Sequence, residues 1–355
     1  MEDRAVLTRP PHAAVADAEG QTTRASEGSL TRPQRLLRDY VFRGLASLRI
    51  LTRIVPRGPS LRLTGALGVL TYYVVAPRRR RVLDHLRLAF PERDAVAQRR
   101  LARRIFARLG ENLAEVLRLG ASRPEEVLEN VRFEGLEHLD AALAGRHGVL
   151  LVTGHVGCWE IMAAAIALRG YPLNVIAREV YDARVDELVV DTRARFGVKT
   201  IQRDQSHAAR EILRTLKRGE ILGLLIDVDI KAPGAFVPFF GQPAWTPTGA
   251  AAFSVRAHAP VVMGFVNREG PTHVIRFEPP LSPETTGDRD ADLVTNTARY
   301  TARIEAAIRR CPEDWVWTHR RWRRVPGPDG IPYLPHKLPG REEIEREHPL
   351  LFRRS

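Results

Sequence analysis

Short apolar runs alternate with helix-like segments through the middle of the chain. The segments between several of these runs end at a glycine, as helices commonly do. Residues 273–277 instead alternate polar and apolar side chains, which predicts an edge or antiparallel strand. Buried strands are predicted at residues 149–153, 173–177, 198–201, 221–226 and 261–266. The pattern therefore predicts an α/β fold with a central, mostly parallel sheet flanked by helices.

The N-terminal third has a different pattern. Residues 1–34 lack the apolar core of a secretory signal and are predicted to form a disordered tail. Within residues 35–90, an apolar-rich stretch is followed by a charge-free stretch at 63–77, which is shorter than the roughly 20 residues of a spanning helix. This pattern favours an interfacial or re-entrant hydrophobic helical hairpin that associates with a membrane, and an ordinary buried helix pair fits it as well.

The remaining boundaries follow from the strand pattern. We assign residues 91–325 to the α/β domain and residues 326–355 to a C-terminal extension. Residues 232–255 carry no charge, but their proline and glycine content argues against a transmembrane helix. We predict an ordered loop over the site there.

A candidate for chemistry follows the apolar run at 149–153. His155 stands in a glycine-containing turn, and Glu160 begins an alanine-rich helix. Ligands of open α/β sheets bind beyond the carboxyl ends of strands, so an imidazole there is a candidate general base. Gly154 and Gly157 place His155 outside the helix, from where Glu160 is expected to reach back and orient the ring. A capping or surface coincidence is the alternative.

Composition narrows the classes of partner. The 355-residue chain is 44% hydrophobic and carries a formal net charge of +13, which favours anionic partners such as nucleic acid, lipid head groups or an acidic carrier protein. It lacks zinc-finger spacing and an RNP-like strand, so nucleic acid is disfavoured. The two cysteines, Cys158 and Cys311, are too few for a disulfide framework and indicate a reduced, cytosol-facing protein.

The segment GHVGCWE (residues 154–160) resembles the His-x4-Glu/Asp motif of the lysophospholipid acyltransferase superfamily. Its form is similar to GHxGNWE, which is typical of the bacterial lipid A lauroyl/myristoyl acyltransferase branch and of the related phosphatidylinositol mannoside acyltransferases. Further blocks that resemble this branch lie at residues 79–91, 131–139, 227–249 and 300–323. The chain departs from the pattern at Cys158 and His85, where the branch usually has asparagine, and at Val228, where glutamine is common.

The resemblance implies a glycerolipid acyltransferase-like fold and a membrane-associated enzyme. Such an enzyme transfers a fatty acyl chain from acyl carrier protein or coenzyme A to a hydroxyl of a glycolipid, for example a lipid A precursor, at the cytoplasmic face of the bacterial inner membrane. No cofactor or metal is implied. His155 would take the hydroxyl proton, Glu160 would fix the tautomer of its ring, and backbone N–H groups of the turn would hold the oxyanion.

Six further residues are candidates for substrate binding. The two arginines are expected to hold a phosphate of the donor or acceptor. The two aspartates are expected to position the PFFG loop or to bind an acceptor hydroxyl, with metal binding a weaker alternative. N-capping is favoured for the second threonine, with ligand contact as the alternative. These candidates are Arg178, Arg193, Asp227, Asp229, Thr246 and Thr248.

Two other functions remain open at this stage. In a thiol hydrolase or thioesterase, Cys158 would be the nucleophile, with His155 as base and Glu160 as the orienting group. A non-catalytic basic protein that binds membranes or nucleic acid is the second. The segment WVWTHRRWRR (residues 315–324) is expected to pack its tryptophans on the domain or at a bilayer and to present arginines to an anionic partner, and a purely structural role is equally open.

Overall fold

A seven-stranded sheet forms the centre of the computed structural model, which describes residues 31–179, 182–327, 332–334 and 346. The strand order is β1-β9-β8-β2-β5-β3-β4, and every neighbouring pair is parallel except β8–β9. The strands are β1 (Val131–Glu134), β2 (Val149–Thr153), β3 (Leu173–Ala177), β4 (Lys199–Gln202), β5 (Ile221–Leu225), β8 (Val261–Glu269) and β9 (Thr272–Phe277). The predicted α/β class with a mostly parallel sheet is therefore confirmed.

The strand predictions hold in detail where the apolar runs are continuous. β2 and β3 coincide with the predicted ranges, and β4, β5 and β8 differ from them only at their ends. β9 is antiparallel to β8, as one of the two alternatives predicted. It is not an edge strand, however, because β1 pairs with its other side.

The predicted loop over residues 232–255 is wrong. The structure forms a β-hairpin, β6 (Gly234–Phe239) and β7 (Gln242–Pro247), followed by α10 (Gly249–Ala257). Phe240 and Gly241 connect the two strands with φ of 52° and 72°, the left-handed conformation of a type I′ turn. Such turns usually carry Asn-Gly, so the Phe-Gly sequence hid the hairpin.

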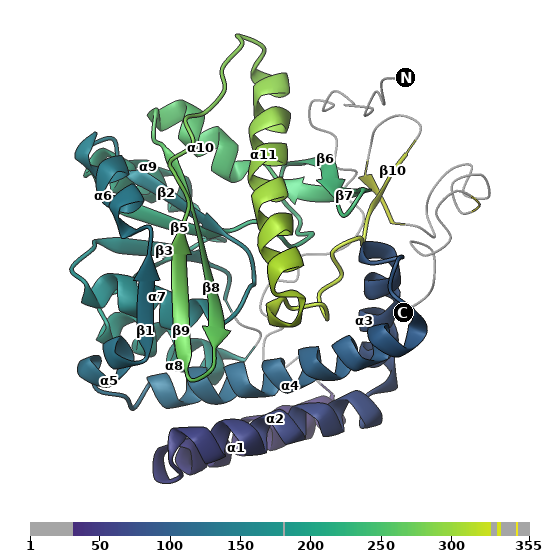
Figure 1. Cartoon of the computed structure of the whole chain (residues 1–355). Coiled ribbons are helices and arrows are strands. Elements are labelled where there is room, and N and C mark those ends of the chain that lie inside the picture. The colour runs from purple at the N-terminus through teal and green to yellow at the C-terminus, as the bar shows by residue number, and fades with distance from the viewer. Residues whose placement is uncertain (1–30, 180–181, 328–331, 335–345, 347–355) are drawn as a thin grey trace.

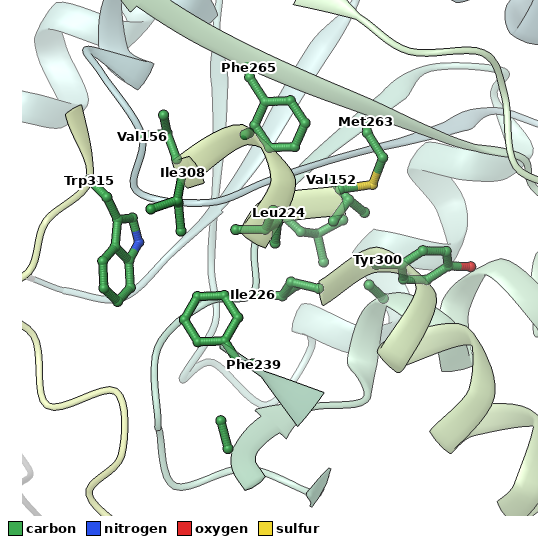
Figure 2. Packing of buried hydrophobic residues seen from close by; sticks show 14 of the residues in the cluster. Val152, Val156, Leu224, Ile226, Phe239, Met263, Phe265, Tyr300, Ile308 and Trp315 are labelled. Carbon is green, nitrogen blue, oxygen red and sulfur yellow. The ribbon is translucent and has the colours of Figure 1, made fainter. Parts of the chain in front are cut away.

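Helices cover both faces of the sheet (Figure 1), which explains why the central strands β2 and β5 are mostly apolar on both faces. On β2, Leu150 and Val152 belong to the core with α9 (Ala208–Lys217), α10 and α11 (Arg289–Arg310). Val149 and Leu151 face the opposite core, which is built with α5 (Pro124–Glu129), α6 (Leu136–Ala144) and α7 (Trp159–Leu168). Figure 2 shows the first core, where sheet residues meet Tyr300 and Ile308 of α11, Phe239 and Trp315.

The N-terminal helices are α1 (Arg32–Ile54), α2 (Arg57–Val74), α3 (Ala76–Ala89) and α4 (Ala95–Leu119). In Figure 1, α1 and α2 lie along the side of α4 that faces away from the sheet. The α2–α4 crossing brings the two backbones into contact. A Cβ at Gly68 would lie 2.1 Å from the Phe106 carbonyl oxygen, and one at Gly110 would lie 2.1 Å from that of Thr64. Only glycine fits at these positions.

Large apolar side chains are exposed along α1 and α2. Among the helices that the structure describes, none has both the length and the hydropathy needed to cross a bilayer. An ordinary buried helix pair would hide its large apolar side chains, whereas ten of those that the structure describes on α1 and α2 are exposed. They are Leu36, Tyr40, Val41, Ile50, Ile54, Leu63, Leu67, Leu70, Tyr73 and Val74, here called the N-terminal apolar surface.

Candidate functional site

His155 stands in the turn between β2 and α7, at the carboxyl edge of the sheet. The turn needs its two glycines. Gly157 has φ of 64°, and a Cβ there would lie 1.9 Å from the Val266 carbonyl oxygen. A Cβ at Gly154 would lie 2.8 Å from an oxygen of Asp227. The glycines thus let His155 approach a neighbouring carboxylate closely.

The carboxylate that orients the imidazole is Asp227. Its Oδ1 lies 2.7 Å from His155 Nδ1, and its Oδ2 accepts from the His155 backbone N–H and from Trp315 Nε1–H, each at 2.7 Å. The sequence predicts Glu160 for this role and a substrate contact for Asp227. The structure differs because β2 and β5 are parallel neighbours, so the residues that follow them meet at the same edge.

The environment keeps Asp227 ionised. Burial alone would raise its pKa, but the charge of His155 and the hydrogen bonds from His155 and Trp315 outweigh burial and hold the pKa well below its usual range. A carboxylate on Nδ1 makes that nitrogen the protonated one in the neutral ring. Nε2 is then left as an acceptor, which is the state a general base requires.

Glu160 contacts an arginine instead. From the first turn of α7, its oxygens accept from Arg193 Nε at 2.9 Å and Arg193 Nη2 at 2.6 Å, and Trp159 Nε1 donates to it at 3.2 Å. Arg193 belongs to α8 (Ala183–Arg195). The pair spans α7 and α8 and is only slightly exposed, with side-chain exposures of 15% for Arg193 and 11% for Glu160.

A cavity of about 330 Å³ opens beside His155. Its polar lining is formed by Thr153, His155, Glu160, Arg178, Arg193, Arg203 and His319. Its other walls are mostly apolar side chains of α7 and of strands β2, β3 and β5, including Leu151, Met162, Ile166, Leu173, Val175 and Leu224. Gly223 in the middle of β5 also lines it. The cavity thus joins a polar group of residues at His155 to an apolar interior between α7 and the sheet.

The structure brings both predicted arginines to this cavity. Arg193 is engaged with Glu160, and Arg178 has its Nε 3.7 Å from Asp204 and is 54% exposed. Arg203, which the sequence analysis missed, lines the same cavity and contacts the same Asp204 at 3.2 Å. It follows β4 as Arg178 follows β3, so its place at the strand end was the available signal.

The other three substrate candidates make hydrogen bonds within the protein and do not line the cavity. Asp229 accepts from the backbone N–H of Arg324 at 2.9 Å. Thr246 is buried and accepts from Arg321 Nη2 at 2.5 Å. Thr248 occupies the N-cap position of α10 as predicted, but its hydroxyl donates to the Pro233 carbonyl at 3.4 Å and does not cap the helix.

The C-terminal segment forms part of the site. Trp315, Trp317 and Trp322 are buried in the domain, which excludes the bilayer alternative for them. Arg321 is also fully buried, so the expectation that it faces an anionic partner is wrong. Its guanidinium donates to Trp245 O and Thr246 instead. His319, which no feature of the sequence singled out, has its ring centroid 4.8 Å from that of His155.

Cys158 does not have the properties of a nucleophile. It precedes α7 with 2% exposure and does not line the cavity. Burial first, and then the charge of Glu115, raise the pKa of its thiol far above the usual range. Within the described residues, no group of three His, Cys, Asp or Glu side chains gathers in a way that could hold a metal ion.

Comparison with known proteins identifies relatives of this chain. The family model for bacterial lipid A biosynthesis acyltransferases matches residues 31–324. The chain is similar to a lipid A biosynthesis acyltransferase of Haemophilus influenzae (25% identity, covering 76% of this chain and 83% of that protein). It is also similar to the lipid A biosynthesis lauroyltransferase of Escherichia coli (26%, covering 76% and 87%) and to the phosphatidylinositol mannoside acyltransferase of Mycobacterium tuberculosis (26%, covering 53% and 58%).

Proposed function

The chain belongs to the family of bacterial lipid A biosynthesis acyltransferases, and from this premise we propose that it transfers a fatty acyl chain from a thioester donor to a hydroxyl of a membrane glycolipid. The donor is acyl carrier protein or coenzyme A carrying the acyl chain, and the acceptor is a lipid A precursor or a related glycolipid. The observation that carries the proposal is the His155–Asp227 pair, whose imidazole lines a largely apolar cavity.

In the proposed mechanism, Asp227 holds the Nδ1–H of His155, and Nε2 takes the proton of the acceptor hydroxyl. The hydroxyl oxygen attacks the thioester carbonyl carbon, the new C–O ester bond forms and the C–S bond breaks. The imidazolium then returns its proton to the leaving sulfur. The proposed mechanism forms no covalent bond between the acyl group and the enzyme, and it uses no cofactor or metal ion.

The cavity suggests where the two substrates lie. Its apolar part, between α7 and the sheet, suits the hydrocarbon chain of the donor. Arg178 and Arg203 at its polar part suit a phosphate of the donor or the acceptor. We assign Glu160 to holding Arg193 in the cavity wall, where the pair acts on substrate binding and not on the proton transfer.

The N-terminal apolar surface supports binding at the cytoplasmic face of the inner membrane. Arg43, Arg53, Arg62, Arg78 and Arg80 are exposed on the same helices and on the start of α3. Apolar side chains with cationic neighbours suit an anionic bilayer interface. We propose that this hairpin lies on the membrane surface.

The test of the reaction uses purified protein with acyl carrier protein or coenzyme A thioesters and a glycolipid in mixed micelles. Mass spectrometry should detect an acylated lipid with the wild type and none with His155→Ala, since loss of a general base typically slows a reaction by about 10² to 10⁴. Comparing membrane lipids of cells with and without the protein would identify the acceptor. Near-normal transfer by His155→Ala would overturn the mechanism.

The membrane proposal has its own test. Leu67→Glu combined with Leu70→Glu should weaken sedimentation with vesicles that contain phosphatidylglycerol. Val96→Glu on α4, another exposed apolar position, is the matched control and should leave binding unchanged. Binding should survive high salt if apolar insertion dominates. A wild-type protein that stays in the supernatant at low and at high salt would contradict the proposal.

A further inference from the structure

A second imidazole lies beside the proposed base. The rings of His155 and His319 have centroids 4.8 Å apart and planes inclined by 57°. Both residues line the same cavity, although 164 positions separate them in the sequence. The polar part of the cavity therefore presents two histidines to whatever reacts there.

The chain holds His319 in this place from two sides. Two backbone hydrogen bonds join the C-terminal segment to the turn between β2 and α7. The Gly157 N–H of the turn donates to the Asp314 carbonyl at 2.8 Å, and the Val316 N–H donates to the His155 carbonyl of the turn at 3.2 Å. These bonds tie the start of the C-terminal segment to the residues around His155. A group fixed in this way relative to the base is suited to a preorganised role.

Helix α3 holds the two residues that precede His319. The Nδ1–H of His85 donates to the Trp317 carbonyl at 3.0 Å, and Arg81 donates to the Thr318 carbonyl at 3.3 Å. Both contacts are made through the backbone of the segment, so neither engages the His319 ring. The ring is placed by its neighbours and remains available to a substrate.

The His319 ring has an unusual environment. His319 is half-buried and lines the cavity, and among the residues that the structure describes no group hydrogen bonds to either of its ring nitrogens. Burial first, and then the charge of His155, lower its pKa to about 4, against the opposing charge of Asp227. At neutral pH the ring is therefore uncharged, with one N–H donor and one acceptor. An uncharged ring also does not oppose the imidazolium that forms on His155.

We propose that His319 is a catalytic residue whose N–H donates to the thioester carbonyl oxygen, the atom that gains negative charge as the acceptor attacks. The inference rests on the proposed acyl transfer. His155 must face the hydroxyl oxygen, and that oxygen must approach the carbonyl carbon, so the carbonyl oxygen comes within a few Å of the neighbouring ring. His319 forms and breaks no bond, and it keeps its proton throughout. Such donors act most strongly on the transition state.

The test compares His319→Ala and His319→Gln with the wild type in the acyl transfer assay. The alanine variant should lose about 10²- to 10³-fold in kcat with little change in KM, the usual effect of removing one oxyanion donor. Glutamine keeps an N–H donor on a side chain of similar length and should recover part of the loss. Between pH 6 and 8 the ratio of wild-type to His319→Ala rates should stay constant, because the ring is uncharged over this range.

His147→Ala, at an exposed histidine between α6 and β2, is the control and should match the wild type. A normal kcat for His319→Ala, an effect confined to KM, or no rescue by glutamine together with a fall in melting temperature would overturn the inference. His155→Ala separates this failure from that of the proposed function. If His155→Ala is inactive and His319→Ala is normal, only the role of His319 is wrong; if both are active, the acyl transfer mechanism is wrong as well.

Discussion

Replacing Asp227 by asparagine tests the arrangement that distinguishes this site from the one expected from the sequence. Oδ2 accepts two N–H bonds, from the His155 backbone and from Trp315, whereas among the described residues Oδ1 is hydrogen bonded only to His155 Nδ1. An asparagine has one oxygen, and turning its NH₂ toward the two donors would leave two buried N–H groups unpaired, at about 1–3 kcal/mol each. The oxygen should therefore stay with them, and the NH₂ should face Nδ1.

That orientation forces the wrong tautomer on His155. An NH₂ group donates to Nδ1, so the ring proton moves to Nε2, which can no longer accept the proton of the acceptor hydroxyl. In a serine protease triad the equivalent exchange lowers kcat about 10⁴-fold, or about 5 kcal/mol, and we expect a loss of this order here. The melting temperature should change little, because two of the three hydrogen bonds remain and the third is kept with its direction reversed.

The assay is the initial rate of acyl transfer with saturating donor and acceptor, together with a thermal melt of each variant. Asp229→Asn is the matched control, since Asp229 lies two residues away and binds Arg324 instead of the imidazole. It should retain kcat. Glu160→Gln should mainly raise KM, because Glu160 holds Arg193 in the cavity wall. A kcat within about tenfold of wild type for Asp227→Asn would refute the tautomer argument, and a larger kcat loss for Glu160→Gln than for Asp227→Asn would return the orienting role to Glu160.

Three further predictions follow from single sites. Burial lowers the pKa of His85 to about 4, so as the pH is lowered from 6.5 to 4 the unfolded state binds the proton first and the free energy of unfolding decreases. His85→Asn keeps a donor for the Trp317 carbonyl and should flatten this slope by up to about 1.4 kcal/mol per pH unit in denaturant titrations. An unchanged slope would contradict the assignment. Gly110→Val should lower the free energy of unfolding by about 1–3 kcal/mol or more, because its Cβ would meet the Thr64 carbonyl. Gly44→Ala, at a position with open space around it, should be neutral or stabilising. Equal effects of the two variants in thermal melts would argue against the close α2–α4 crossing. Cys158→Asn should retain acyl transfer, since the thiol is buried and protonated; an acyl group trapped on Cys158 and found by mass spectrometry would favour the thiol mechanism.

The parts of the fold that the sequence predicts well are those in which local pattern and tertiary position agree. β2 and β3 are mostly apolar because both faces of the sheet are covered, and their limits could be read directly from the sequence. The β6–β7 hairpin was missed because its turn uses Phe240 in a left-handed conformation, which the residue type does not indicate.

The candidate site could be predicted only as far as its local segment. The turn, His155 and the nearby Glu160 lie within a few residues, but the carboxylate that reaches the ring belongs to Asp227, which follows β5, and strand order is not contained in local spacing. The aspartate at the end of an apolar run was a usable signal for the sheet edge, but not for its partner. Likewise, the tryptophans of the C-terminal segment gave no sign that one of them donates to Asp227 across 88 positions.

The C-terminal segment at residues 314–319 is therefore part of the candidate site. Trp315 Nε1–H donates to Asp227, the Asp314 carbonyl accepts from the Gly157 N–H, and the His319 ring lies beside that of His155. Asp314 is in turn bound by Arg108 of α4 at 2.7 Å and by Asn267 of β8 at 3.0 Å. Because α4 is also the helix on which α2 packs, the same helix supports both the N-terminal apolar surface and the segment that completes the site. If the N-terminal apolar surface binds a membrane as proposed, α4 therefore links the membrane-binding helices to the residues around His155.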